Sequence, residues 1–273
     1  MQYKLIASDI DGTLIGYDYN LNEKNIQAIK KAVDAGIKFV LCSGRSPSSM
    51  DKYAKILGLD KEGYYHIGYN GNAIYEGHNY KKRLPFVTLQ KDLAIEITKY
   101  IKDKLPKANI LIHTIDDLLL SERAPSVMKI DDDHGGFSIN NIKSFDNLTE
   151  DVMKVIIMGE NNELQIAYDY IKDKINGRFA MVFSSHFILE FMPLEVNKGL
   201  ALTTLSNMLQ IPMSQVVACG DNYNDLEMIQ VAGLGVAVKN AVEPLKNIAN
   251  YITKNDATSG AIAEVIEKIL EVR

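Results

Sequence analysis

Short apolar runs alternate with helical patterns in the first part of the chain. The runs at 5–7 and 37–42 are mostly apolar, as buried strands are. Each precedes a stretch with apolar residues at helical spacing, 22–35 and 46–58, and Asn22 and Ser46 are suitable N-caps for the two helices. Strand, helix, strand, helix predicts a parallel sheet with crossover helices, whose sites lie beyond the carboxyl ends of the strands.

The pattern changes at about Leu84. The expected helices then cover 93–101 and 164–175, and the expected strands cover 109–113, 154–158, 179–183 and 188–192. A polar stretch between them contains Asp131-Asp132-Asp133, and an acidic run of this kind is usually a solvated loop. We expect a separate α+β unit here, inserted into the first domain.

The earlier pattern returns after this insertion. It predicts helices over 197–209, 226–229 and 259–269 and strands over 215–219 and 235–238. The predicted fold class is therefore α/β. A Rossmann-like parallel-sheet core domain is formed by 1–83 and 192–273, and an α+β domain is inserted over 84–191.

Composition narrows the class of protein. The chain has 273 residues, of which 47% are hydrophobic and 24% charged, as in ordinary globular proteins. Its net charge of −5 does not favour nucleic-acid binding, which calls for a basic surface. No apolar stretch is long enough to cross a bilayer, and residues 1–4 do not resemble a signal peptide. We expect a cytoplasmic protein that binds neither nucleic acid nor membrane.

Two aspartates one residue apart follow the first apolar run, in Asp9-Ile10-Asp11-Gly12. The glycine indicates that the strand ends here, so that backbone and carboxylate oxygens can converge beyond it. Such oxygens suit Mg²⁺, and with the metal bound one carboxylate can attack phosphorus while the other transfers a proton. An acidic turn after an edge strand is an equally good interpretation of this stretch alone.

The second predicted strand ends in Ser43-Gly44-Arg45. Ser43 offers a hydroxyl and Gly44 a backbone amide that a ligand can approach closely. A plain turn before the next helix explains this stretch about as well. For the similar Asn70-Gly71 pair we favour a hairpin turn without a functional role.

Lys198 stands at the start of the predicted helix over 197–209, with Asn197 as the N-cap. A lysine at a helix N-terminus opposes the helix dipole, which favours anions there. A phosphate bound between the lysine and the free N–H groups would account for it. The alternative is a solvated lysine with a modest local cost.

A second pair of carboxylates follows the strand over 215–219, in Gly220-Asp221-Asn222-Tyr223-Asn224-Asp225. Asn224 adds a neutral donor. Helix capping by Asp or Asn would explain one of these side chains, but two aspartates are more than a cap requires.

Together the four stretches argue more strongly than each does alone. Each follows a strand or begins a helix, so a parallel sheet can gather them at one edge. Their chemistry is complementary, because they supply carboxylates, a hydroxyl and a cation suited to a transferring phosphoryl group. The side chains concerned are Asp9, Asp11, Ser43, Lys198, Asp221 and Asp225.

These motifs resemble those of the haloacid dehalogenase superfamily, and within it the Cof-type sugar-phosphatase-like branch with a large C2-type cap. The resemblance covers essentially the whole chain, in the order 9–14, 43–45, 197–199 and 220–225. The region over 84–191 matches the position of the cap, which in this family closes over the site and contacts the leaving group. Asn72 and Glu195 depart from the usual pattern without touching the chemistry.

The resemblance implies a Mg²⁺-dependent phosphatase that hydrolyses small-molecule phosphomonoesters, such as sugar or cofactor phosphates, through an aspartyl-phosphate. Asp9 would be the nucleophile and Asp11 the acid and base. Mg²⁺ would be held by the Asp9 carboxylate, the Asp11 carbonyl and Asp221, with Asp225 as a ligand or as support. The residues expected to bind phosphate are Gly12, Ser43, Gly44, Lys198 and Asn224.

Two other functions are compatible with the same residues. A phosphomutase or phosphotransferase on this scaffold would use the same aspartates and return the phosphoryl group to its sugar. A phospho-accepting signalling domain also combines carboxylates, a hydroxyl and a lysine around Mg²⁺, but it would be much shorter and would need no inserted cap. No pattern in the sequence predicts an oligomeric state.

Overall fold

The computed structural model describes residues 3–16, 19–83, 87–115, 119–122, 129–130, 137–175 and 177–271. The chain divides into two compact units. The first comprises Met1–Pro85 and Asn197–Arg273, and the second comprises Phe86–Val196. These junctions lie a few residues beyond the predicted ones, and at the second junction the strand that ends the inserted unit continues through Met192. The acidic run at 131–133 lies outside the described residues.

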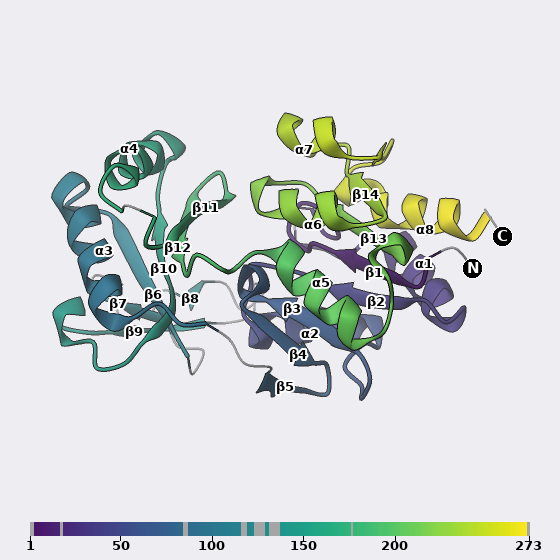
Figure 1. The fold of residues 1–273 in the computed structure, drawn as a ribbon, viewed down its shortest axis with the longest axis horizontal. Helices are drawn as coiled ribbons and strands as arrows, with labels where there is room; N and C mark the ends of the chain where they lie inside the picture. The colour runs from purple at the N-terminus through teal and green to yellow at the C-terminus, as the bar shows by residue number, and fades with distance from the viewer. Residues whose placement is uncertain are drawn as a thin grey trace. The chain divides into compact units, whose positions relative to one another are not determined.

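A five-stranded parallel sheet forms the centre of the first unit, in the order β15-β14-β13-β1-β2 (Figure 1). Its strands are buried almost throughout, which is why they read as continuous apolar runs. The predicted parallel sheet is thereby confirmed. The strands are β1 (Leu5–Ser8), β2 (Lys38–Leu41), β13 (Val216–Gly220), β14 (Leu234–Ala237) and β15 (Tyr251–Ile252).

Helices cover both faces of this sheet (Figure 1). One buried cluster joins Ile6 of β1 to the helices α1 (Glu23–Asp34), α2 (Pro47–Leu57) and α8 (Ala261–Glu271). The other joins Leu5 to the helices α5 (Lys198–Met208), α6 (Leu226–Val231) and α7 (Glu243–Ile248). Successive strand residues therefore serve opposite cores, as the alternation of side chains along a strand requires.

Side-chain caps start the helices where the sequence predicted them. Asn22 accepts from the backbone N–H of Lys24, and Ser46 caps α2 ahead of Pro47. The last helix differs from prediction, because a short 3₁₀ turn over Ala257–Ser259 precedes it. Gly260, in the left-handed conformation at φ 96°, separates this turn from α8.

A small antiparallel sheet adjoins β2 in the first unit. It consists of β3 (Tyr65–Gly68), β4 (Ala73–Glu76) and β5 (Asn79–Arg83). The N–H of Ser43 donates to the carbonyl of Ile67 at 2.9 Å, which links this sheet to the end of β2. The predicted turn at Asn70-Gly71 connects β3 to β4 as the 3₁₀ segment η1 (Tyr69–Gly71).

The second unit is an α+β structure, as predicted. Its sheet has seven strands in the order β11-β12-β10-β6-β7-β9-β8, and all but one of the neighbouring pairs are antiparallel. The helices α3 (Lys91–Lys104) and α4 (Asn161–Lys172) contribute to its own buried cluster. The strands are β6 (Asn109–Thr114), β7 (Leu119–Ser121), β8 (Lys129–Ile130), β9 (Phe137–Asn141), β10 (Val152–Met158), β11 (Ala180–Ser185) and β12 (Ile188–Met192).

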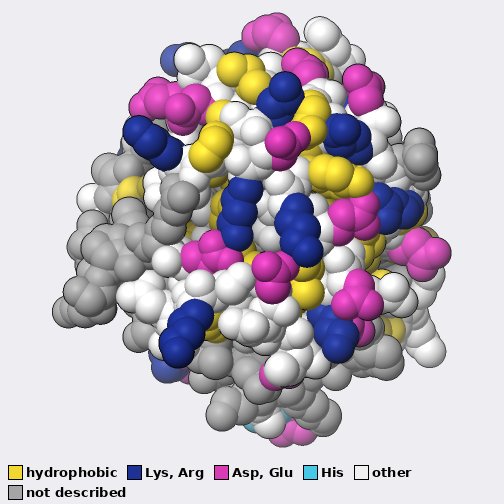
Figure 2. Space-filling model, turned by 90° about the vertical axis from the view of Figure 1, so that its left-hand side faces the viewer, with side chains coloured by type: hydrophobic (Ala, Val, Ile, Leu, Met, Phe, Trp, Pro, Cys, Tyr) yellow, Lys and Arg dark blue, Asp and Glu magenta, His cyan; other side chains and the backbone are white. Residues whose placement is uncertain are grey.

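Charged side chains of both signs are interspersed over the face of the molecule shown in Figure 2. Among the ion pairs of the structure, Arg178 donates two hydrogen bonds to Glu96 of α3, at 2.7 and 2.6 Å. Within the described ranges, no helix is both long enough and apolar enough to span a membrane. The expected cytoplasmic location stays a prediction.

Candidate active site

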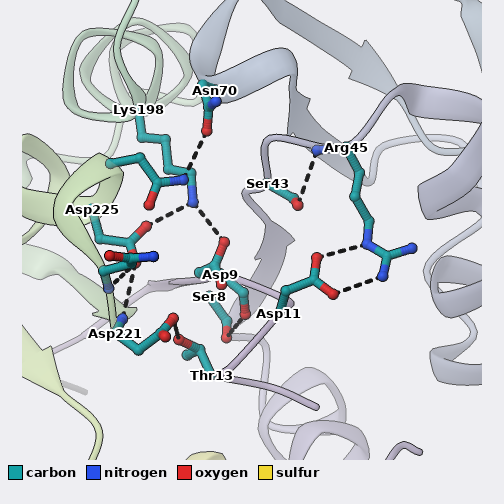
Figure 3. Close-up of polar contacts among 12 residues, drawn as sticks. Ser8, Asp9, Asp11, Thr13, Ser43, Arg45, Asn70, Lys198, Asp221 and Asp225 are labelled. Atoms are coloured by element: carbon teal, nitrogen blue, oxygen red, sulfur yellow. Dashed lines mark hydrogen bonds and ion pairs between the residues drawn. The ribbon is translucent and has the colours of Figure 1, made fainter. Parts of the chain in front are cut away.

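Three neighbouring strands of the central sheet end at the same edge, and each is followed by a predicted site residue. Asp9 follows β1, Ser43 comes two residues after β2, and Asp221 follows β13 (Figure 3). Because β1 pairs in parallel with both β2 and β13, their carboxyl ends are aligned. The N–H of Asp9 donates to the carbonyl of Cys219 at 2.9 Å, which fixes the first loop to the end of β13.

Lys198 lies between two carboxylates. Its Nζ donates to Oδ1 of Asp9 and to Oδ1 of Asp225, each at 2.6 Å, and the side chain is 0% exposed. The alternative of a solvated lysine is therefore wrong, because the carboxylates supply the charge that water would otherwise screen. Burial alone would lower the pKa of Lys198, but Asp225 and Asp9 together raise it above its ordinary value.

Negative charge exceeds positive charge in this buried group. Asp9, Asp221 and Asp225 are all buried, and Lys198 is the cation in contact with two of them. Burial raises the pKa of Asp9 to about 7 against the opposing effect of Lys198, and burial also raises the pKa of Asp221. A bound cation would offset the repulsion among these buried carboxylates.

The donor atoms fit a magnesium ion. One carboxylate oxygen from each of Asp9, Asp221 and Asp225 lies within 4.8 Å of the others. Hard carboxylate oxygens are the ligands that Mg²⁺ prefers. Both oxygens of Asp225 already accept hydrogen bonds. Its Oδ1 accepts from Lys198, and its Oδ2 accepts from the N–H groups of Asp221 and Asn222 at 2.9 and 3.1 Å.

The loop after β1 closes tightly around Asp221. Gly12 has φ 86°, and a Cβ at this position would lie 2.4 Å from Oδ2 of Asp221. Thr13, which sequence reasoning did not single out, donates its hydroxyl to Oδ1 of Asp221 at 2.9 Å. The N–H of Gly12 donates to the carbonyl of Ile15 at 2.8 Å. In this structure Gly12 therefore provides room for Asp221, and its predicted role in binding phosphate stays a prediction.

Asp11 is paired with an arginine for which we had predicted no role. Arg45 donates from Nε and a terminal nitrogen to the two oxygens of Asp11, at 2.7 and 2.6 Å (Figure 3). The guanidinium also lies 5.4 Å from the centre of the Tyr53 ring. Its position two residues after Ser43, inside the same short motif, is the signal that could have identified it.

The loop after β2 meets a residue that we had assigned to a turn. Oγ of Ser43 accepts from the N–H of Arg45 at 3.2 Å. A Cβ on Gly44 would lie 3.0 Å from Oδ1 of Asn70, and Asn224 donates its amide to this same oxygen at 2.9 Å. Asn70 is thus a third residue at the site that sequence reasoning missed, after Thr13 and Arg45.

All the predicted site residues lie in the first unit, and their contacts link them into two groups. Asp9, Lys198, Asp221 and Asp225 form one group with Gly12 against it. The other group is centred on Arg45 and Asn70. Arg45 contacts Ser43 and Asp11, and Asn70 contacts Gly44 and Asn224. The arrangement places the Asp9 carboxylate beside a lysine and beside carboxylate oxygens that can hold a metal ion. Such a set of groups suits transfer of a phosphoryl group.

Comparison with known proteins agrees with this chemistry. The chain is 30% identical over 292 residues to the 5-amino-6-(5-phospho-D-ribitylamino)uracil phosphatase YwtE of Bacillus subtilis, covering 98% of each protein. It is 28% identical over 253 residues to the HMP-PP phosphatase of Serratia proteamaculans, covering 90% of this chain and 87% of that protein.

Solved structures show the same fold. A haloacid dehalogenase-like hydrolase from Bacteroides thetaiotaomicron superimposes with a TM-score of 0.84 at 28% identity, covering 98% of this chain and 99% of the other. TM0651 from Thermotoga maritima gives 0.79 at 25% identity, covering 97% of both. The sequence model of haloacid dehalogenase-like hydrolases matches residues 6–266. The chain therefore belongs to the haloacid dehalogenase-like hydrolase family, which confirms the resemblance and the enzyme class expected from the sequence.

Proposed function

We propose that this protein is a Mg²⁺-dependent phosphatase that hydrolyses small-molecule phosphomonoesters through a phosphorylated Asp9. The observation that carries the proposal is the contact of Asp9 with Lys198 inside a group of buried carboxylates. The two sequence relatives named above are phosphatases by name, and one is named after a phosphorylated uracil compound, which supports a small-molecule substrate.

Asp9 is the proposed nucleophile. One of its oxygens bonds to phosphorus as the bond from phosphorus to the leaving oxygen breaks, and Asp11 gives its proton to that oxygen. Water then attacks the phosphorus, Asp11 takes the proton from the water, and the bond to Asp9 breaks to release inorganic phosphate. Arg45 orients Asp11 by donating one hydrogen bond to each of its oxygens, and each oxygen keeps a second lone pair that can take up a proton.

The proposed metal ligands are the Asp9 carboxylate, the Asp11 carbonyl and Asp221. Magnesium bound there would supply positive charge that neutralises the phosphoryl oxygens. Asp225 is then best described as support, because it holds both Lys198 and the N–H of Asp221. A supporting carboxylate of this kind orients the ligands of the metal.

The phosphoryl oxygens would be bound by groups from all four motifs. Lys198 brings a positive charge, Ser43 a hydroxyl, and Asn224 a side-chain amide. The backbone at Gly12 and Gly44 can approach the phosphoryl group closely because neither residue has a side chain. We assign selection of the leaving group to the second unit, Phe86–Val196, as the resemblance implies.

The proposal is tested by phosphate release from a panel of phosphomonoesters, with Mg²⁺ and with a chelator. The panel includes sugar phosphates and the compounds after which the relatives are named. We expect release that requires Mg²⁺ and that falls at least about a thousandfold in Asp9→Asn, since an amide cannot attack phosphorus.

Asp34→Asn is the matched control, because Asp34 ends α1 on the exposed surface and should leave turnover unchanged. Normal turnover in Asp9→Asn would contradict the proposal. Release that is equally fast in chelator would contradict its metal requirement.

A further inference from the structure

The turn between β3 and β4 has an unusual backbone. Three successive residues have positive φ, with 52° at Tyr69, 55° at Asn70 and 104° at Gly71. Asparagine and glycine tolerate this region, but an aromatic residue there is uncommon and costs energy. Both Tyr69 and Asn70 are 1% exposed, so the surrounding structure holds them in place. Backbone strain of this kind concentrates at functional sites.

Two backbone hydrogen bonds fasten this turn to the loop after β2. The N–H of Tyr69 donates to the carbonyl of Arg45 at 2.9 Å, and the N–H of Asn70 donates to the carbonyl of Ser43 at 3.0 Å. A Cβ on Gly44 would lie 3.0 Å from Oδ1 of Asn70. The side chain of Asn70 therefore stands directly beside the backbone proposed to receive the phosphoryl group.

The same turn packs against the start of α5. A Cβ on Gly71 would lie 2.2 Å from the carbonyl oxygen of Asn197 and 3.1 Å from the nitrogen of Lys198. Because a side chain cannot fit here, the two backbones touch directly. The turn thus contacts both the loop of Ser43 and the helix start that carries Lys198.

A third connection runs through a side chain. Asn224 donates one amide N–H to Oδ1 of Asn70 at 2.9 Å. A side-chain amide has two N–H donors and one carbonyl, and its orientation is set by its hydrogen-bond partners. An acceptor at Asn70 therefore determines on which side Asn224 presents its NH₂ group.

We propose that Asn70 is a positioning residue of the phosphoryl-binding site. Its carbonyl oxygen holds the Asn224 amide so that the second N–H of Asn224 donates to an oxygen of the phosphoryl group. Its left-handed backbone keeps the turn seated between the Ser43 loop and the start of α5. The inference rests on the proposed function, which makes Asn224 a phosphate ligand.

Binding of inorganic phosphate, measured calorimetrically in the presence of Mg²⁺, tests the inference without requiring turnover. Asn70→Gly removes the side chain and keeps the left-handed backbone, so the turn is preserved. We expect the dissociation constant for phosphate to rise about three- to tenfold in Asn70→Gly and by a similar factor in Asn224→Ala, as expected for the loss of one hydrogen bond.

The double variant separates positioning from independent action. If Asn70 acts through Asn224, Asn70→Gly combined with Asn224→Ala binds phosphate no more weakly than Asn224→Ala alone. Gln210→Gly is the matched control, because Gln210 also has a positive φ of 55° but is exposed after α5, outside the site. It should leave phosphate binding unchanged.

Two results would overturn the inference. One is phosphate affinity in Asn70→Gly within about twofold of the wild type, a smaller effect than one lost hydrogen bond gives. The other is a double variant in which the two losses multiply. A wild type that binds phosphate but releases none from any ester would overturn the proposed function instead, and the coupling of Asn70 to Asn224 would still be measured.

Discussion

A single side chain, Lys198, forms ion pairs with two of the three buried carboxylates of the site. It lies 2.6 Å from both Asp9 and Asp225 and has no exposed surface. Removing one partner of a buried ion pair leaves an uncompensated charge, which costs more than the pair itself contributes. We infer that Lys198 matters for folding stability as well as for binding the phosphoryl group.

Lys198→Met keeps much of the volume of the side chain and removes its charge. We expect the free energy of unfolding, measured with urea in chelator, to fall by about 3–5 kcal/mol, because Asp9 and Asp225 lose their counter-charge. Turnover with Mg²⁺ should fall as well. Lys55→Met is the control: Lys55 is exposed and pairs with Asp51 on α2, so a change within about 0.5 kcal/mol is expected. Equal stability of the two variants would contradict this account of Lys198.

At the scale of elements, His66 joins the small sheet to the central one. Its Nδ1 accepts from the N–H of Leu41 on β2 at 3.2 Å, and its Nε2 lies 3.2 Å from the carbonyl of Leu59. These two contacts require a neutral ring with the proton on Nε2. Burial lowers the pKa of His66 to about 4. The strand β3, and with it the turn of Asn70, is held by an uncharged histidine.

The contribution of His66 to stability should therefore fall on acidification. The unfolded chain binds a proton at His66 near its ordinary pKa of 6.5, whereas the folded chain resists protonation down to about 4. The contribution of His66 is complete above the higher value and is lost as pH falls to the lower one, by roughly 3 kcal/mol. This contribution is measured by urea unfolding of the wild type and of His66→Asn at pH values between 6.5 and about 4.

The comparison isolates this histidine because both proteins share every other titrating group. Asp9 and Asp221, whose pKa values are raised, stabilise the fold on acidification in the wild type and in the variant alike. Asparagine keeps an acceptor near Nδ1 without titrating. We expect the stability of the wild type, measured relative to that of His66→Asn, to fall as the pH is lowered through this window. Parallel pH curves for the two proteins would contradict the assignment.

The elements themselves were largely predictable from local pattern. Buried parallel strands are visible in the sequence as continuous apolar runs. Asn22 and Ser46 are residue types that favour the N-cap position, and both cap a helix in the structure. Strand order predicted that Lys198 and Asp9 lie at the same edge of the sheet, but not their direct ion pair, because the two residues are 189 positions apart and the helix dipole is only a local signal. Asn70 was missed for the same reason: an Asn-Gly pair favours a turn in any case, and its partner Asn224 is 154 positions distant.

At the scale of the whole molecule, each unit has its own buried core. The family motifs all belong to the first unit, which explains why the proposed chemistry could be inferred from sequence spacing and strand order. The second unit carries no such motif, and its sheet mixes antiparallel pairs with one parallel pair. The preferred leaving group, whose selection we assign to this unit, therefore has to be determined with a panel of substrates.

The most direct test of the central claim is chemical trapping of the phosphorylated nucleophile. Asp11→Asn, mixed with Mg²⁺ and p-nitrophenyl phosphate, should accumulate phosphorylated Asp9, because p-nitrophenolate leaves without a proton while water activation is lost. Borohydride reduction followed by peptide mass spectrometry should then find homoserine at position 9, and none in Asp9→Asn. Homoserine at another position, or p-nitrophenolate release at the wild-type rate with no modified residue, would contradict the account.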